Sequence, residues 1–176
     1  MKINELYQSI INDLKNGKRP LVKLNEQVLD DIYESYSQCL SQSDRELLMK
    51  VLCILDNTQT TTRRFEEFIL KSFETFTDSE AIIFLLGTFQ KQVAEARFKD
   101  GHRLEMSHLQ LLERLLEHDD PEVVEWTLRI IESIGSQGLF FKKKIFAMKP
   151  NFFERFNKHR KAIFQIIEML EKRWGH

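Results

Sequence analysis

The stretch Asp119-Asp120-Pro121-Glu122-Val123-Val124-Glu125-Trp126-Thr127-Leu128-Arg129-Ile130-Ile131-Glu132-Ser133-Ile134-Gly135 contains all the signals of one amphipathic helix. Asp120 can cap its first turn, Pro121 suits the first helical position, and Gly135 can end it with a positive φ. The apolar residues between these marks recur every three or four positions and fill one side. Such a helix needs a neighbour to cover its apolar side, so the stretch predicts other helices packed around it.

Similar signals elsewhere predict an all-α fold. Ser43 with Glu46, and Thr77 with Glu80, have the spacing of a capping box, which predicts that helices begin at Ser43 and Thr77. The segment 81–93 is apolar on nearly every side and is expected to be central and buried. No segment alternates convincingly enough to predict a strand.

Two more helices are expected after Gly138. The first is short, rich in lysine and aromatic residues, and reaches Met148. The second is long, is capped by Asn151 after the break at Pro150, and runs to Trp174.

Length and composition are typical of one globular domain, expected to cover residues 1–176. Apolar residues make up 42% of the chain and charged residues 30%. The longest apolar run, Ala81 to Gly87, is too short to span a membrane, and the N-terminus has no apolar core of a signal peptide. Cys39 and Cys53 lie in apolar segments without a CxxC spacing, so we expect two buried reduced thiols and a cytoplasmic protein.

Three of the expected helices share one internal pattern. Asp44, Asp78 and Asp120 fall in register, at offsets of 34 and 42 residues. The positions that follow them also correspond: Glu46/Glu80/Glu122, Leu47/Ala81/Val123, Leu48/Ile82/Val124, Val51/Leu85/Thr127, Leu52/Leu86/Leu128 and Leu55/Phe89/Ile131. Each offset accommodates a pair of antiparallel helices, as in helical repeats with a period near 40 residues.

The stretch that begins at Asp120 resembles the second helix of a HEAT repeat. In that family Asp-Pro starts the helix, small and branched apolar residues pack inward, and glycine ends it, as Asp120-Pro121, Thr127-Leu128 and Ile134-Gly135 do here. The chain departs from the family at Val124, where arginine is frequent, and the two earlier copies lack the proline. The resemblance implies a HEAT-like α-solenoid of stacked helix pairs, with an irregular helical bundle as the alternative.

The sequence contains no recognisable motif of a catalytic, metal or cofactor site. Its five histidines have neither an HExxH nor a Cys/His zinc spacing, and His102, His108 and His118 are expected at the surface. His159 falls within the apolar side of the last helix and is expected to bond to a neighbour in the core. We therefore predict that the protein is not an enzyme and uses no cofactor.

Charge is divided unevenly along the chain. Residues 139–176 hold ten Lys or Arg and three Asp or Glu, whereas residues 1–138 hold 16 and 24. Arg160 falls inside the apolar side of the last helix, where it must extend to solvent, pair with a carboxylate or meet a partner. The candidate binding surface consists of the basic residues of this segment: Lys142, Lys143, Lys144, Lys149, Arg155, Lys158, Arg160 and Lys161.

Three interpretations of this basic surface remain open. It is the solvated outer side of a terminal helix, or it docks an acidic protein or the chain's own acidic part, which includes Glu117, Glu122 and Glu125. In the third interpretation it contacts phosphates of nucleic acid or of anionic lipid. We expect a non-catalytic protein-binding module, with a nucleic-acid-associated protein as the alternative; the division of charge also permits head-to-tail self-association.

Overall fold

The computed structural model describes residues 3–20, 22–149 and 157–175. All the regular elements in these ranges are helices, which confirms the all-α class, and an isolated bridge between Val22 and Thr58 is the only β pairing within them. The chain divides into two compact units, Met1–His102 (unit 1) and Arg103–His176 (unit 2). The expectation of a single domain over residues 1–176 stays a prediction.

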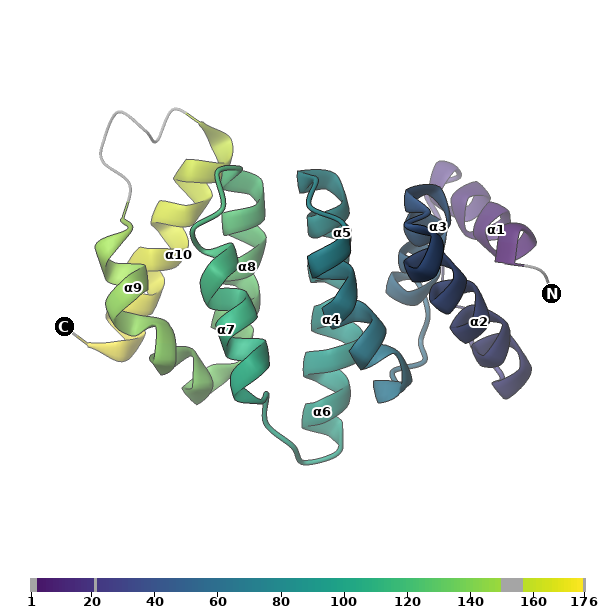
Figure 1. The fold of residues 1–176 in the computed structure, drawn as a ribbon. Helices are drawn as coiled ribbons and strands as arrows, with labels where there is room; N and C mark the ends of the chain where they lie inside the picture. Colours follow the sequence, from purple (N-terminus) through teal and green to yellow (C-terminus); the bar gives the residue numbers. More distant parts are fainter. Residues whose placement is uncertain (1–2, 21, 150–156, 176) are drawn as a thin grey trace. The chain divides into compact units, whose positions relative to one another are not determined.

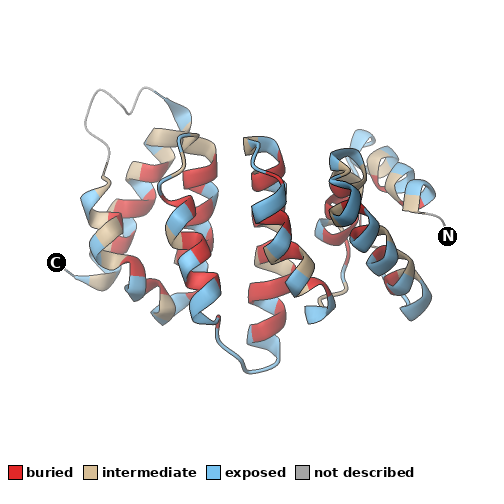
Figure 2. Cartoon of the chain, viewed as in Figure 1, coloured by how far each residue is buried: buried red, intermediate tan, exposed pale blue. Residues whose placement is uncertain are grey.

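Unit 1 is built of two layers of helices (Figure 1). Its elements are α1 (Ile3–Lys15), α2 (Glu26–Gln42), α3 (Arg45–Asp56), η1 (Arg63–Phe65), α4 (Glu66–Thr75), α5 (Ser79–Phe89), η2 (Gln90–Glu95) and α6 (Ala96–Lys99). α3 packs between α1 and α5, while α2 packs against α4. Contacts of α2 with α3 and of α4 with α5 join the two layers, and the buried residues lie along the sides that face each other (Figure 2).

The three aspartates in register each cap a helix, which the sequence predicts only for Asp120. The backbone N–H groups of Leu47, Ala81 and Glu122 donate to Asp44, Asp78 and Asp120, respectively, at 3.0, 3.1 and 2.9 Å. The predicted helix starts at Ser43 and Thr77 are wrong, because the cap lies one residue later in both cases. Ser43 instead ends α2 in the left-handed conformation, with φ of 51°.

α5, η2 and α6 form one continuous helix whose middle turn is a π-helix. Buried Gln92 in this turn donates to the carbonyl oxygens of Leu55 and Thr60, at 3.0 Å each, and accepts from the N–H of Thr62 at 3.0 Å. The segment between α3 and α4 is thereby fixed to η2. Most residues of segment 81–93 are buried, as predicted, but Phe84 is 39% exposed.

Unit 2 is organised around α8 (Figure 1). Its elements are α7 (Met106–Leu115), α8 (Pro121–Ser133), η3 (Gly135–Phe141), α9 (Lys142–Ala147) and α10 (Lys158–Trp174). α8 packs against α7, η3 and α10. Pro121 occupies the first turn of α8, and Gly135 follows it with φ of 63°, as the sequence predicts.

Two sequence predictions for unit 2 are wrong. The last helix is not continuous from Asn151, because Asn157 has an extended backbone and its side chain caps α10 through the N–H groups of His159 and Arg160. The proposed cap at Asn151 lies outside the described residues. His108 is buried rather than exposed, and its Nδ1 accepts a hydrogen bond of 2.9 Å from the backbone N–H of Glu105 at the start of α7.

Candidate functional site

An open apolar groove crosses the α1–α3–α5 layer of unit 1. Its volume is about 520 Å³. The lining residues come from all three helices: Tyr7, Ile11, Arg45, Glu46, Met49, Cys53, Glu80 and Phe84. Apart from Phe84, the apolar and sulfur-containing members are buried or half-buried, and we call these members with Phe84 the floor; the charged members are exposed, and we call them the rim.

Helical spacing brings the floor together. Tyr7 and Ile11 are four residues apart on α1, as Met49 and Cys53 are on α3, so each pair lies on one side of its helix. Phe84 of α5 completes the floor and is one of the exposed large apolar side chains of the chain. Apolar side chains from three packed helices therefore remain partly open to solvent, which is unusual unless the surface has a use.

The charged rim is held by internal ion pairs. Arg45 Nη2 lies 2.7 Å from Asp78 Oδ1 and 2.6 Å from Glu80 Oε2, and Lys50 Nζ lies 2.7 Å from Glu46 Oε1. The hydrogen bond from Arg45 lowers the pKa of the Asp78 carboxyl. This rim offers both signs of charge, so a partner of either charge pattern can be oriented by it.

The two cysteines lie at different depths in unit 1. Cys39 is fully buried, and burial raises the pKa of its thiol to about 12. Cys53 is 7% exposed in the floor of the groove, and burial also raises its pKa. Neither thiol is primed as a nucleophile, because the raised pKa disfavours the thiolate. Cys53 nevertheless provides a chemical probe of the groove.

Three residues of the predicted basic surface are paired inside unit 2. Lys144 Nζ lies 2.7 Å from Glu117 Oε1, and Lys149 Nζ lies 2.6 Å from Glu171 Oε2. Lys142 Nζ donates to the backbone oxygen of Trp174 at 3.3 Å. Lys142 and Lys144 attach α9 to its neighbours, Lys149 attaches the residues after α9 to α10, and all three cations are only partly available to a partner.

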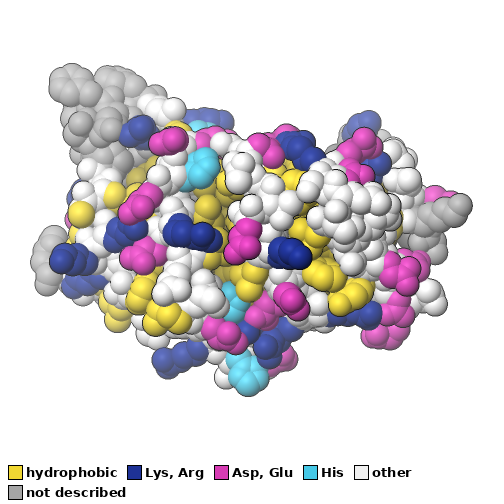
Figure 3. All heavy atoms as spheres, viewed as in Figure 1, with side chains coloured by type: hydrophobic (Ala, Val, Ile, Leu, Met, Phe, Trp, Pro, Cys, Tyr) yellow, Lys and Arg dark blue, Asp and Glu magenta, His cyan; other side chains and the backbone are white. Residues whose placement is uncertain are grey.

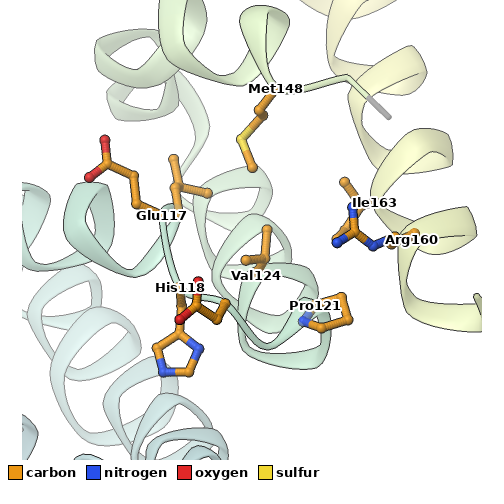
Figure 4. A pocket seen from close by; sticks show the side chains of 9 residues that line it. Glu117, His118, Pro121, Val124, Met148, Arg160 and Ile163 are labelled. Atoms are coloured by element: carbon orange, nitrogen blue, oxygen red, sulfur yellow. The ribbon is translucent and has the colours of Figure 1, made fainter. Parts of the chain in front are cut away.

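Lys143, Lys158 and Lys161 are exposed, and no partner for them lies among the described residues. Arg155, another residue of the predicted surface, lies outside those residues. Arg160 is half-buried and lines a smaller pocket of about 180 Å³ in unit 2, where it lies near Ile163 and faces the space between α10 and Met148 (Figure 4). The structure therefore divides the predicted surface into paired, exposed and pocket-lining residues.

Acidic α8 and basic α10 are joined by further polar contacts. His159 Nδ1 lies 2.8 Å from Glu125 Oε2, and its Nε2 lies 3.4 Å from Glu122 Oε2. Arg173 Nη2 lies 2.9 Å from Glu132 Oε1 at the other end of the two helices. Part of the uneven charge of the sequence is thus used to attach the basic segment to the acidic part of the same unit.

Within the described ranges, no three His, Cys, Asp or Glu side chains are grouped closely enough to hold a metal ion. In the same ranges, no helix has the length and apolar character needed to cross a bilayer. Comparisons with protein-family models, with curated proteins and with solved structures find no match to this chain. Functional inference therefore depends on the geometry of the two units.

The groove is the part of the site that sequence reasoning missed. Its one signal in the sequence was the apolar character of segment 81–93, which predicts a central, buried helix. In the sequence, Tyr7 and Ile11 share the apolar side of one expected helix, and Met49 has no distinguishing signal. Only their arrangement on neighbouring helices shows that they share one open surface.

Proposed function

We propose that this chain is a non-catalytic protein-binding module built of HEAT-like helical repeats. The observation that carries the proposal is the open apolar groove across α1, α3 and α5. The two-layer packing of unit 1 and the equivalent caps at Asp44 and Asp78 support the repeat assignment. The buried free thiols favour a reducing compartment, so the cytoplasm is the proposed location.

The groove is suited to an amphipathic helix of a partner protein. Such a helix places apolar side chains at every third or fourth position into a groove, and flanking charges fix its orientation. Met49 gives the floor an adaptable surface, because methionine is flexible and polarisable. Arg45 and Glu80 at the rim can orient the polar flanks of the same helix.

Partner capture with a groove variant tests this proposal. Met49→Glu places a charge on the floor and is expected to abolish retention of partners that the wild-type chain retains. Met106→Glu is the matched control, since Met106 is an exposed methionine of unit 2. Circular dichroism checks that both variants keep their helices. Equal retention by Met49→Glu and by wild type contradicts the proposal.

Alkylation of Cys53 provides a second measurement with any purified partner. N-ethylmaleimide should modify Cys53 slowly in the free chain, and a bound partner should slow the reaction further. Cys39 is the internal control, because it is fully buried and should stay unmodified in both states. A partner that binds without changing the rate at Cys53 does not occupy the groove.

Association with nucleic acid is the second candidate function. Three exposed lysines favour it: Lys143, Lys158 and Lys161. If these residues supply the phosphate contacts, the logarithm of the affinity should fall with the logarithm of salt concentration with a slope of about −3. Mobility-shift titrations across salt measure this slope. Absence of binding at low salt eliminates the candidate.

A further inference from the structure

The η3–α9 turn of unit 2 exposes an apolar tip. Leu139 and Phe140 are adjacent in the sequence, and they are 48% and 45% exposed. Ser136 and Lys143 are also exposed, and the spacing of the four residues puts them on one side of the helical turns. We refer to Ser136, Leu139, Phe140 and Lys143 as the η3–α9 ridge. In Figure 3 hydrophobic side chains lie at the surface over this part of unit 2, with both basic and acidic side chains around them.

Gly138 and Phe141, which neighbour the exposed Leu139 and Phe140, are closely packed, so the fold itself keeps Leu139 and Phe140 at the surface. A Cβ atom on Gly138 would lie 2.9 Å from both the Trp174 ring and the Ile131 carbonyl oxygen, which leaves space only for glycine. Phe141 is fully buried, and its ring meets that of Phe140 edge-on with centroids 5.0 Å apart. Leu139 and Phe140 therefore point outward from a rigid base.

Gln137 fixes the start of the same turn to the segment that precedes α7. Its side chain donates to the backbone oxygen of Leu104 and accepts from the backbone N–H of Leu104, at 2.9 Å in both bonds. Because these bonds and the buried Phe141 already order the turn, it loses little conformational entropy when a partner binds its tip.

Positive charge accompanies the apolar tip: Lys143 follows Phe140 by three residues, and Lys172 lies two residues before Trp174, whose ring lies against Gly138. Lys143 is exposed without a partner in the described part of the chain, and so is Lys172 near the end of α10. Lys142 and Lys144 are half-buried, and the partner of Lys144 is the exposed Glu117. A complementary binding surface offers apolar groups to Leu139 and Phe140 and negative charge to the lysines.

We propose that the η3–α9 ridge docks unit 2 onto an anionic membrane surface. Leu139 and Phe140 enter the boundary between headgroups and acyl chains, while Lys143 and Lys172 lie at the level of the lipid phosphates. A bilayer supplies both the apolar layer and the negative charge, and a projecting tip needs no shaped pocket to enter it. This surface is distinct from the groove of unit 1 and gives the module a second kind of partner.

Vesicle sedimentation tests the proposal with the full chain. Wild type should bind phosphatidylcholine vesicles that contain phosphatidylserine, should bind pure phosphatidylcholine much more weakly, and should lose affinity as salt is added. The double variant Leu139→Ser/Phe140→Ser should lose affinity roughly tenfold or more, because the apolar tip is removed. Lys143→Glu should lose affinity about tenfold for charged vesicles.

Matched variants of unit 2 separate the ridge from general effects of polarity and charge. Met106→Ser removes a comparably exposed apolar side chain outside the ridge, and Arg114→Glu reverses an exposed arginine of α7. Both should bind charged vesicles like wild type, and circular dichroism should show unchanged helix content in every variant. The proposal is overturned if wild type fails to bind charged vesicles at low salt, in which case an acidic protein is the next occupant to test. It is also overturned if the double serine variant binds like wild type, because binding would then be electrostatic alone.

Discussion

Asp78 stabilises two helices at once, since it caps α5 and accepts a bidentate pair of hydrogen bonds from Arg45 at the start of α3. Asp78→Ala removes both interactions and should lower the free energy of unfolding by about 1 kcal/mol or slightly more. Asp78→Asn keeps one oxygen for the cap but loses the charge and one of the two acceptors for Arg45, so its loss should be smaller than that of the alanine variant. Urea denaturation at neutral pH measures both values, and equal losses would show that the cap contributes little.

The carboxyl group of Asp78 should also make the stability of the fold depend on pH in the acid range. Bonding to Arg45 lowers the pKa of Asp78 in the folded chain relative to the unfolded chain. Its contribution to stability is therefore complete above the unfolded pKa of about 3.9 and is lost as pH falls through the folded pKa. Asp78→Asn should show a shallower loss of stability than wild type in this acid range. Parallel stability curves for the two proteins would contradict this assignment.

Arg97 forms the most buried ion pair of unit 1. It is 5% exposed, and its Nε lies 3.0 Å from both carboxylate oxygens of Glu66. Arg97→Met leaves that carboxylate without its main counter-ion and should lower the free energy of unfolding by about 3 kcal/mol. Arg63 pairs with the same carboxylate from a more exposed position, so the control Arg63→Met should cost about 0.5 kcal/mol or less. Similar losses in the two variants would mean that burial does not strengthen the Arg97 pair.

At the scale of elements, Gln92 joins the π-helical turn η2 to the segment that links α3 and α4. Gln92→Leu leaves the carbonyl oxygens of Leu55 and Thr60 and the N–H of Thr62 without this partner, and should cost about 2 kcal/mol. Hydrogen exchange should become faster at Thr62, while Leu48 within α3 stays protected as the internal control. Unchanged exchange at Thr62 would show that another contact holds the segment.

Elements with a local signal were predictable from the sequence. The cap at Asp120 depends only on a nearby backbone N–H group, and its local pattern predicted it, whereas Asp44 and Asp78 were recognised only as positions in register with it. The helix starts predicted at Ser43 and Thr77 were wrong because each is followed directly by a second capping residue, Asp44 or Asp78. Local spacing does not tell which of two adjacent residues caps the helix. The π-helical turn had no local signal, since Gln92 is stabilised by bonds to residues more than 30 positions away.

The candidate sites were less predictable, because they depend on neighbours that are remote in sequence. The lysine cluster was visible, but its pairing with Glu117 and the contact of Lys142 with Trp174 require the packing of α9. The groove was not visible, since Tyr7, Met49 and Phe84 are separated by long segments and meet only across packed helices. Periodicity identifies the apolar side of a helix, but it does not tell whether another helix covers it.

At the scale of the whole molecule, the acidic and basic parts of the sequence are not simply two poles. Within unit 2, acidic residues of α8 contact His159 and Arg173 of basic α10. These contacts neutralise, inside unit 2, part of the charge that the sequence alone assigns to a partner surface. Four lysines remain exposed in the described part of unit 2: Lys143, Lys158, Lys161 and Lys172. So few charges attract a distant partner weakly, which favours a binding function that combines charge with an apolar contact.

Unit 1 should fold without unit 2, because the contacts that define it lie within residues 1–102. These include the Asp78–Arg45 pair and the anchoring of α4 and its preceding segment by Gln92 and Arg97. We expect a fragment of residues 1–102 to be helical by circular dichroism and to unfold cooperatively in urea. A fragment of residues 1–89 is the matched control: it keeps the helices of both layers through α5 but lacks Gln92 and Arg97, and it should unfold with little cooperativity. Loss of structure in the longer fragment would instead favour one domain over all 176 residues, as the sequence alone predicts.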